Sequence, residues 1–194
     1  MTDSVGIVVA TFGNRDRWKG LARKALASTH NQTEPPDAVV WWHGEGLQDA
    51  RNLGAAHIDT DWLIFLDADD ELDVGYVAAM KAASGDIRRP STLGVYSDGT
   101  EDEEPVLIPA RGDGLDTGNY IVIGAMVRAS LFHAVGGFDD YPILEDWDLW
   151  RRMVKAGAII GDAPDAVYRV GVREGSRNTD TGLHGRIYTA IRSK

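Results

Sequence analysis

The 194-residue chain contains no cysteine, so it can form neither disulfides nor thiolate metal sites. It has only five histidines, and no apolar run approaches the roughly 18 residues that a membrane span needs. Its first apolar run is short and lacks the preceding basic residues of a secretory signal. These absences predict a soluble, cytoplasmic protein. Any metal ligands are expected to be mainly oxygen atoms.

Basic residues are also scarce, with 20 Lys and Arg against 30 Asp and Glu and a net charge of −10. This balance disfavours sequence-independent binding to nucleic acid or to anionic membranes. The charge is uneven, because residues 171–194 carry five basic side chains against two acidic ones. We therefore expect one folded domain over residues 1–170. The basic tail, residues 171–194, is expected to be either a solvated end or a flap over an anionic ligand.

Strand-like and helix-like patterns alternate along the first half of the chain. Continuous apolar, β-branched runs indicate strands covered on both faces, and apolar residues spaced three and four apart indicate helices. The expected strands are residues 5–10, 38–42 and 62–66, and the expected helices cover residues 18–26, 47–56 and 74–83. Asn14 is the expected N-cap of the first helix. This alternation predicts a parallel sheet whose ligands bind beyond the carboxyl ends of its strands.

The second half is less regular. Short strands are expected at residues 93–96 and 106–108, and a last strand at residues 167–170. Ser130 is expected to cap a short helix that Gly136 ends, and a longer helix fits residues 147–156. The acidic stretch between the first two of these strands is interpreted as a solvated loop without chemistry.

Four acidic residues follow the third expected strand, in the stretch FLDADDEL. For Asp70 and Glu71 the simpler interpretation is a turn or a helix N-terminus. Asp67 and Asp69 lie two residues apart and can point to one place beyond the sheet. Two ionised carboxylates share such a place only when a cation joins them, and Mg²⁺ or Mn²⁺ is the natural candidate. From spacing alone, a metal site and a purely structural turn both remain open.

A second acidic pair occurs in the stretch ILEDWDLW. Glu145 and Asp146 precede an expected helix, so N-capping is one interpretation. Trp147 and Trp150 flank them, and a dry aromatic setting raises a carboxyl pKa toward the range useful for a general base. Two acidic centres, one suited to a metal and one to a proton, indicate an enzyme.

Four stretches in order carry a family resemblance: IVVATFGNR, ARNLGAAHIDTDWLIFLDADDEL, IGAMVRASLFHAVGGFDD and EDWDLWRRMVKAG. With them the chain resembles a family 2 glycosyltransferase of the GT-A fold over most of residues 5–157. The resemblance implies a single α/β domain with a Rossmann-like, mostly parallel central sheet flanked by helices. It also implies metal-dependent, inverting transfer of a hexose-type sugar from a nucleotide-diphosphate donor to an acceptor hydroxyl.

The resemblance also implies roles for individual residues. Asp67 would lie by the ribose and the metal, Asp69 would ligate Mn²⁺ or Mg²⁺, and Asp146 would be the general base beside Glu145. Gly124 would leave room for the sugar, and Trp147 would pack against the sugar or the acceptor. The remaining positions matched to the nucleotide sugar are Thr11, Phe12, Asn14, Arg15, Arg51 and Ala68.

The chain departs from the family pattern at two places. After the second strand the family usually has an aspartate that reads the base, whereas this chain has VVWWHGEG. Trp42 or His43 is expected to contact the base instead, which leaves uridine specificity open. The family often ends with Y-R-x-H, but here Gly171 takes the last position. His184 becomes the candidate third metal ligand, with an idle surface histidine as the alternative.

The basic tail suggests a further hypothesis, in which Arg173 and Arg177 contact the donor's diphosphate. Two other function classes remain open. One is a metal-dependent nucleotidyltransferase, although TFGNR is a poor phosphate-binding loop. The other is a non-catalytic nucleotide-sugar or glycan-binding module. A dinucleotide-dependent oxidoreductase is disfavoured, because no G-x-G-x-x-G follows the first strand. The acceptor is open among proteins, glycans and small molecules.

Overall fold

The computed structural model describes residues 3–172 and 181–193, and it describes the side chains of the last helix from Gly185 onward. The strands are β1 (Val5–Phe12), β2 (Ala38–Gly44), β3 (Trp62–Asp67), β4 (Glu71–Leu72), β5 (Ile87–Tyr96), β6 (Met126–Arg128) and β7 (Ile160–Val172). The helices are α1 (Arg15–His30), α2 (Leu47–Ala56), α3 (Tyr76–Ala82), α4 (Ala129–Ala134), α5 (Glu145–Lys155) and α6 (Thr181–Arg192), with a 3₁₀ turn at Gly114–Asp116.

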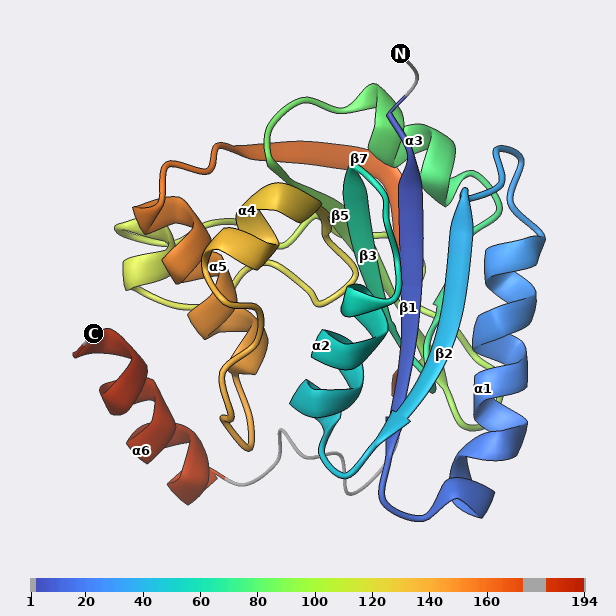
Figure 1. Ribbon diagram of the computed structural model, residues 1–194, viewed down its shortest axis with the longest axis horizontal. Helices are drawn as coiled ribbons and strands as arrows, with labels where there is room; N and C mark the ends of the chain where they lie inside the picture. Colours follow the sequence, from blue (N-terminus) through green and yellow to red (C-terminus); the bar gives the residue numbers. More distant parts are fainter. Residues whose placement is uncertain (1–2, 173–180, 194) are drawn as a thin grey trace.

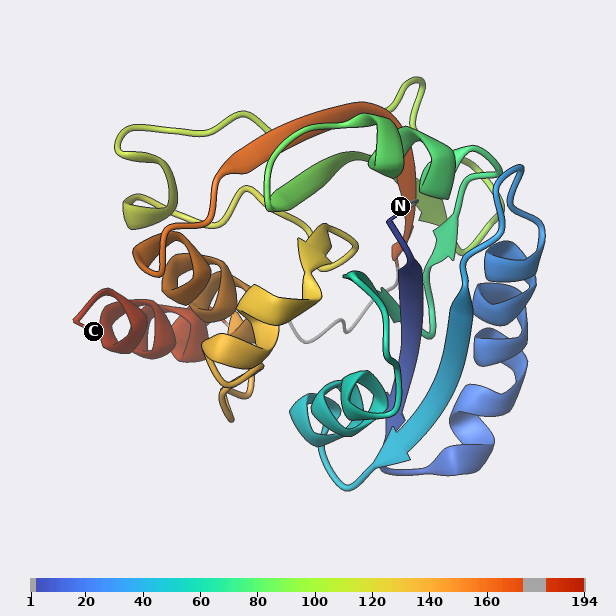
Figure 2. The same cartoon turned by 45° about the horizontal axis from the view of Figure 1, so that its top comes forward.

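One curled sheet with the strand order β2-β1-β3-β6-β5-β7-β4 organises the molecule (Figure 1). β1 pairs in parallel with β2 and β3, and β5 pairs in parallel with β7, so most paired residues are parallel. β6 and β4 are short antiparallel strands within this arrangement. Figure 2 shows α1 and α2 on opposite faces of the β1–β2 pair. This is the α/β architecture that the alternation predicted.

The first half of the chain confirms the expected elements. α2 covers the expected residues, and β1, β2 and β3 each continue one or two residues beyond the expected end. Asn14 caps α1, because its side chain accepts a hydrogen bond from the Asp16 backbone N–H at 3.0 Å. β1 and β3 are almost completely buried, as continuous apolar runs require. The continuous apolar runs predicted β1 and β3 correctly because both strands are covered on both faces.

Three expectations in the second half are wrong. Residues 106–108 form no strand but a single bridge from Val106 to Thr92, and Val106 is 52% exposed. Ser130 is not the N-cap of α4, because the helix begins at Ala129 with Arg128 in the cap position. The last strand is much longer than expected, since β7 pairs with β5 along nearly its whole length. A partner strand, rather than its own periodicity, sets the bounds of β7.

α5 begins at Glu145, two residues earlier than expected, and buries one apolar face. Trp147, Trp150 and Met153 on that face have no exposed surface. α6, within the basic tail, packs toward α5 through Ile191, which is 1% exposed.

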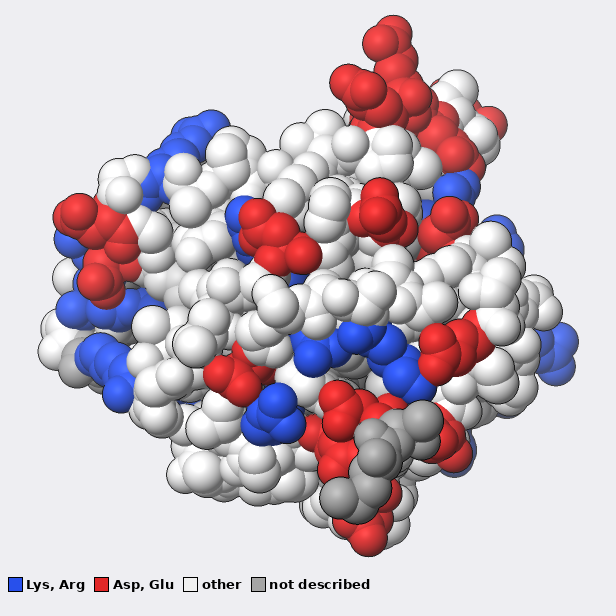
Figure 3. Space-filling model, turned by 90° about the horizontal axis from the view of Figure 1, so that it is seen from above, with Lys and Arg blue, Asp and Glu red and all other residues white. Residues whose placement is uncertain are grey.

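Among the described residues, none of the helices has the length and apolar character that a membrane crossing requires. Figure 3 views the end away from the carboxyl ends of β1 and β3, where acidic and basic side chains are interspersed.

Candidate active site

Three carboxylates lie close together at the carboxyl end of β3. β3 ends at Asp67, and the Asp70 backbone N–H donates to the Asp67 carbonyl at 3.0 Å, which turns the chain back on itself. Carboxylate oxygens of Asp67, Asp69 and Asp70 all lie within 4.8 Å of one another. Three oxygen donors at this spacing match the ligand preference of Mg²⁺ or Mn²⁺. The structure therefore brings Asp67 and Asp69 together, as their spacing predicted.

Asp70 lies in a turn, which was one of its two expected roles, and it is not the N-cap of the following helix, which is Gly75. The Asp70 side chain is 8% exposed and accepts a hydrogen bond from the Gly171 backbone N–H at 2.8 Å. Its other partner is the hydroxyl of Tyr168, which also accepts the Asp67 backbone N–H at 3.2 Å. Burial raises the pKa of Asp70 well above its ordinary value, and the neighbouring charges of Asp67 and Asp69 raise it further. A bound cation would oppose both effects.

Gly124 has a different role from the one the family resemblance implied. A Cβ at this position would lie 2.1 Å from a ring carbon of Tyr168 and 2.8 Å from the Tyr76 hydroxyl. The space beside Gly124 is therefore filled by two buried tyrosines and is not open to a sugar. The glycine lets Tyr168 reach the carboxylates of the β3 turn.

Arg51 joins the two acidic centres. Its Nη2 lies 2.5 Å from Asp67 Oδ1, and its Nη1 lies 2.6 Å from Glu145 Oε1. The side chain is 1% exposed, so this is a buried guanidinium between two carboxylates. Burial alone would lower the pKa of Arg51, but Asp67 and Glu145 raise it, and the group stays cationic. Two of its nitrogens are paired with carboxylates, and the expected position of Arg51 near the nucleotide's base or phosphates stays a prediction.

Asp146 lies at the start of α5 and borders the same cavity as Asp67. The cavity holds about 190 Å³ and is lined by Arg51, Asp67, Asp70, Asn119, Val122, Ile123, Ile143, Leu144, Glu145, Asp146 and Val170. Burial raises the pKa of Asp146 from 3.8 to about 7, and the negative charge of Glu145 contributes to the rise. A carboxyl group that titrates near neutral pH is suited to accept a proton from a substrate.

Two hydrogen bonds hold the Asp146 carboxylate. Its Oδ1 accepts the Trp147 backbone N–H at 2.8 Å, and its Oδ2 accepts the Asn119 side-chain amide at 2.9 Å. Leu144, the N-cap of α5, has a φ of 61°, and it is the only non-glycine residue with a positive φ among the described residues. Left-handed backbone is costly for leucine and tends to persist at functional sites. Here it starts α5 abruptly and puts Glu145 and Asp146 in the first turn.

The sequence of residues 13–88, which includes Arg51, Asp67 and Asp69, matches the profile of the family described as Glycosyl transferase family 2. The matched segment therefore resembles glycosyl transferase family 2 in sequence. The fold of the chain is that of the GT-A glycosyltransferases, with the carboxylates of the β3 turn and of α5 at the edge where such sheets bind ligands. A comparison with curated protein sequences gave no significant match.

Solved structures of Staphylococcus aureus TarS share this glycosyltransferase fold. TarS residues 1–349 in complex with UDP-GlcNAc superimposes with a TM-score of 0.71 at 14% identity, covering 97% of this chain and 66% of that one. A longer TarS structure gives a TM-score of 0.66 at 14% identity and covers 87% and 37%. TarS 1–349 with UDP gives 0.65 at 15% identity and covers 87% and 60%. The chain described here thus spans less than two thirds of each of these TarS chains.

The expected nucleotide contacts lie around the end of β1. Thr11 is buried, and its hydroxyl accepts the Trp41 indole N–H at 2.9 Å and lies 3.0 Å from His43 Nδ1. Trp42 points to the other face, where its ring packs on His57 at 4.2 Å. His43, rather than Trp42, therefore shares the Thr11 side of the sheet.

Two other residues expected to contact the donor make contacts within the protein itself. Arg15 lies over the Trp41 ring at 5.8 Å, and the Phe12 carbonyl accepts the Trp18 indole N–H at 2.6 Å. Asn14 is exposed, and Ala68 is buried in the turn that carries the aspartates. Their contact with a nucleotide stays a prediction.

The expectation that Trp147 packs on the sugar or acceptor is wrong. Its ring has no exposed surface, stacks on Tyr188 of α6 at 4.8 Å, and donates its indole N–H to the Leu115 carbonyl at 2.8 Å. Arg173, Arg177 and the side chain of His184 lie outside the described residues, so their proposed contacts stay predictions.

Asn119, Asp70 and Tyr168 are site residues that sequence reasoning missed. Asn119 is 27 residues from Asp146 in the chain, and Tyr168 is 101 residues from Asp67. No local pattern marks Asn119. A tyrosine in the last expected strand is a weak signal, because buried aromatic residues are common in strands.

Proposed function

We propose that this glycosyltransferase moves a sugar from a nucleotide-diphosphate donor to an acceptor hydroxyl, with inversion and with Mg²⁺ or Mn²⁺. The observation that carries the proposal is the single cavity bordered by both acidic centres, Asp67 with Asp70 on one wall and Asp146 on another. A reacting carbon placed between them would have a leaving-group site and a base within the same cavity.

The β3 turn is the donor side. Asp67, Asp69 and Asp70 would hold the divalent ion, which when bound neutralises the diphosphate and makes it a better leaving group. Arg51 keeps Asp67 in place and compensates part of the carboxylate charge. Because TarS structures hold UDP and UDP-GlcNAc, UDP-sugars are the first donors to test for this chain.

The start of α5 is the acceptor side. Asp146 accepts the proton of the acceptor hydroxyl as that oxygen bonds to the anomeric carbon. The bond from this carbon to the diphosphate breaks in the same displacement, and the nucleoside diphosphate departs. Attack opposite the leaving group inverts the anomeric configuration. Glu145, held by Arg51, keeps a second negative charge beside Asp146 and helps to raise its pKa.

A donor screen tests the proposal. Thermal shift and donor turnover are measured with UDP-, GDP- and TDP-sugars in the presence of Mn²⁺, and again after chelation. We expect a stabilising shift and release of nucleoside diphosphate with at least one donor, both lost on chelation. Pyrophosphate release would instead support a nucleotidyltransferase. Wild-type turnover by Asp146→Asn would remove Asp146 as the base, and donor binding without any turnover would support a binding module.

A further inference from the structure

The side chain of Asn119 makes a contact that the proposed mechanism does not yet use. It lines the active-site cavity and donates its amide N–H to Asp146 Oδ2 at 2.9 Å. The other side of the same amide is also committed, because Asn119 Oδ1 accepts the Ile121 backbone N–H at 3.1 Å. The carboxamide therefore has one consistent orientation, with its NH₂ group toward the carboxylate.

The backbone on both sides of Asn119 is attached to α5, the helix that carries Asp146. Trp147 donates its indole N–H to the Leu115 carbonyl at 2.8 Å, and Trp150 donates its indole N–H to the Ile121 carbonyl at 3.0 Å. Both tryptophans have no exposed surface, so neither hydrogen bond competes with water. The two contacts hold the segment Leu115–Ile121 at its two ends.

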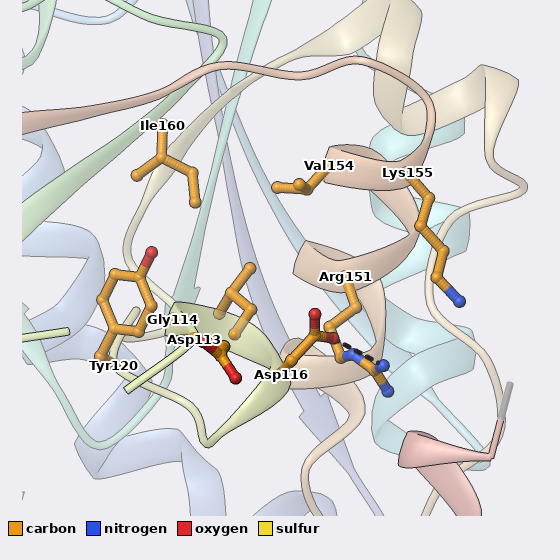
Figure 4. Close-up of a pocket in the computed structure, with 9 residues that line it drawn as sticks. Asp113, Gly114, Asp116, Tyr120, Arg151, Val154, Lys155 and Ile160 are labelled. Atoms are coloured by element: carbon orange, nitrogen blue, oxygen red, sulfur yellow. Dashed lines mark hydrogen bonds and ion pairs between the residues drawn. The ribbon is translucent and has the colours of Figure 1, made fainter. Parts of the chain in front are cut away.

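Two further contacts support the middle of this segment. Arg151 Nη2 lies 2.9 Å from Asp116 Oδ1, and the Tyr188 hydroxyl of α6 donates to the Thr117 carbonyl. Figure 4 shows the Asp116–Arg151 pair beside a second cavity, of about 280 Å³, which Tyr120 also lines. The neighbouring residues Asn119 and Tyr120 thus line different cavities, so the segment borders both of them.

We propose that Asn119 is a positioning residue for Asp146: through its amide, the anchored segment Leu115–Ile121 sets the rotamer of the base. The acceptor hydroxyl is then received only by the carboxylate lone pairs that Asn119 and the Trp147 N–H leave unoccupied. This inference rests on the proposed role of Asp146 as the base. Asn119 acts through Asp146 and needs no contact with the donor.

The test compares Asn119→Ala and Asn119→Asp with the wild-type chain. Asn119 is exposed, so neither substitution creates a buried void, and the thermal midpoint is expected to stay near wild type. We expect Asn119→Ala to lower kcat by about 10- to 100-fold, with donor affinity within about twofold, because a misplaced base costs this much. Asn119→Asp should lose more, since it places a second negative charge against Asp146. Asn31→Ala, at the exposed end of α1, is the matched control and should behave as wild type.

A second readout separates positioning from a merely structural role. The hydrogen bond from Asn119 favours the ionised carboxylate, so its loss should move the acid limb of the kcat/KM profile to higher pH. The same shift should appear in a ¹³C NMR titration of the Asp146 carboxyl group, which needs no turnover. Wild-type kcat and an unshifted titration in Asn119→Ala would overturn the proposal, as would a large loss of donor affinity. Failure of the proposed function is distinct, because it would leave Asp146→Asn fully active.

Discussion

Asp146 is the residue whose environment most affects its chemistry. It is half-buried at the start of α5, next to Glu145, and both burial and the neighbouring charge disfavour its ionised form. Asn119 and the Trp147 N–H oppose these effects with one hydrogen bond to each oxygen. The balance leaves the carboxyl pKa at about 7, where it can accept a proton at physiological pH.

The pH dependence of the reaction should follow this group. The base acts only when Asp146 is deprotonated, so we expect kcat/KM to rise with pH and to level off above about 7. The measurement is initial rate against pH at low substrate concentration with a constant Mn²⁺ concentration. A rate that is already level from pH 5 upward would show that Asp146 is not the proton acceptor.

The protonation state of Asp146 should also affect the stability of the folded protein. Here the protonated form is favourable, whereas the proposed reaction needs the deprotonated form. The pKa of Asp146 is raised from 3.8 to about 7 on folding, so its contribution is complete below about pH 4 and is lost as pH rises through 7. Asp146→Asn does not titrate, and it should be more stable than wild type at pH 8, by at most about 4 kcal/mol. Urea unfolding at pH 4 and pH 8 checks this, since the advantage should appear only at the higher pH.

At the scale of elements, the β3 turn depends on a strand that is remote in sequence. β7 brings Tyr168 and Gly171 to the turn, where they bond to Asp70, and Tyr168 also bonds to the Asp67 backbone. The Tyr168 ring reaches this place only because position 124 has no side chain. The close contact of Tyr168 with Gly124 therefore sets the shape of the carboxylate group.

Gly124→Ala should disturb both packing and the proposed metal site. The new methyl group would overlap the Tyr168 ring, and overpacking of this kind typically costs about 1–3 kcal/mol. Because Tyr168 would move away from Asp67 and Asp70, Mn²⁺ affinity should fall as well. Denaturant unfolding and Mn²⁺ titration by electron paramagnetic resonance measure the two effects.

Gly20→Ala is the matched control for this substitution. Gly20 is an exposed position in α1 with nothing within 4 Å of a built Cβ. Alanine is favoured over glycine inside a helix, so this variant should be up to about 1 kcal/mol more stable, with unchanged Mn²⁺ affinity. Equal behaviour of the two variants would contradict the role assigned to Gly124.

At the scale of the whole molecule, Arg51 connects the N-terminal β-α-β unit with the C-terminal part of the chain. It projects from α2, and its two carboxylate partners belong to β3 and α5. The net charge of −10 makes such a connection useful, because five carboxylates gather at this edge of the sheet. Without a cation between them, the two acidic centres would repel one another.

Arg51→Met keeps an unbranched, though shorter, side chain and removes its charge. It leaves Asp67 and Glu145 without their partner in a buried setting, which typically costs about 3–5 kcal/mol. We expect a loss of this size in denaturant unfolding without added metal. Arg23→Met, at an exposed position of α1, is the control and should change stability by less than about 0.5 kcal/mol. A small effect of Arg51→Met would show that the two centres do not need this link.

The amino-acid sequence by itself determined the β-α-β-α-β order, the cap at Asn14 and the acidic ends of β3 and α5. These features arise from neighbours in the chain, where apolar spacing and capping act within a few residues. Only the tertiary structure decided that Arg51 meets Glu145 across 94 residues, that Tyr168 fills the space beside Gly124, and that Asn119 holds Asp146. Such contacts depend on how the sheet curls and which elements it brings together, and no local periodicity encodes them.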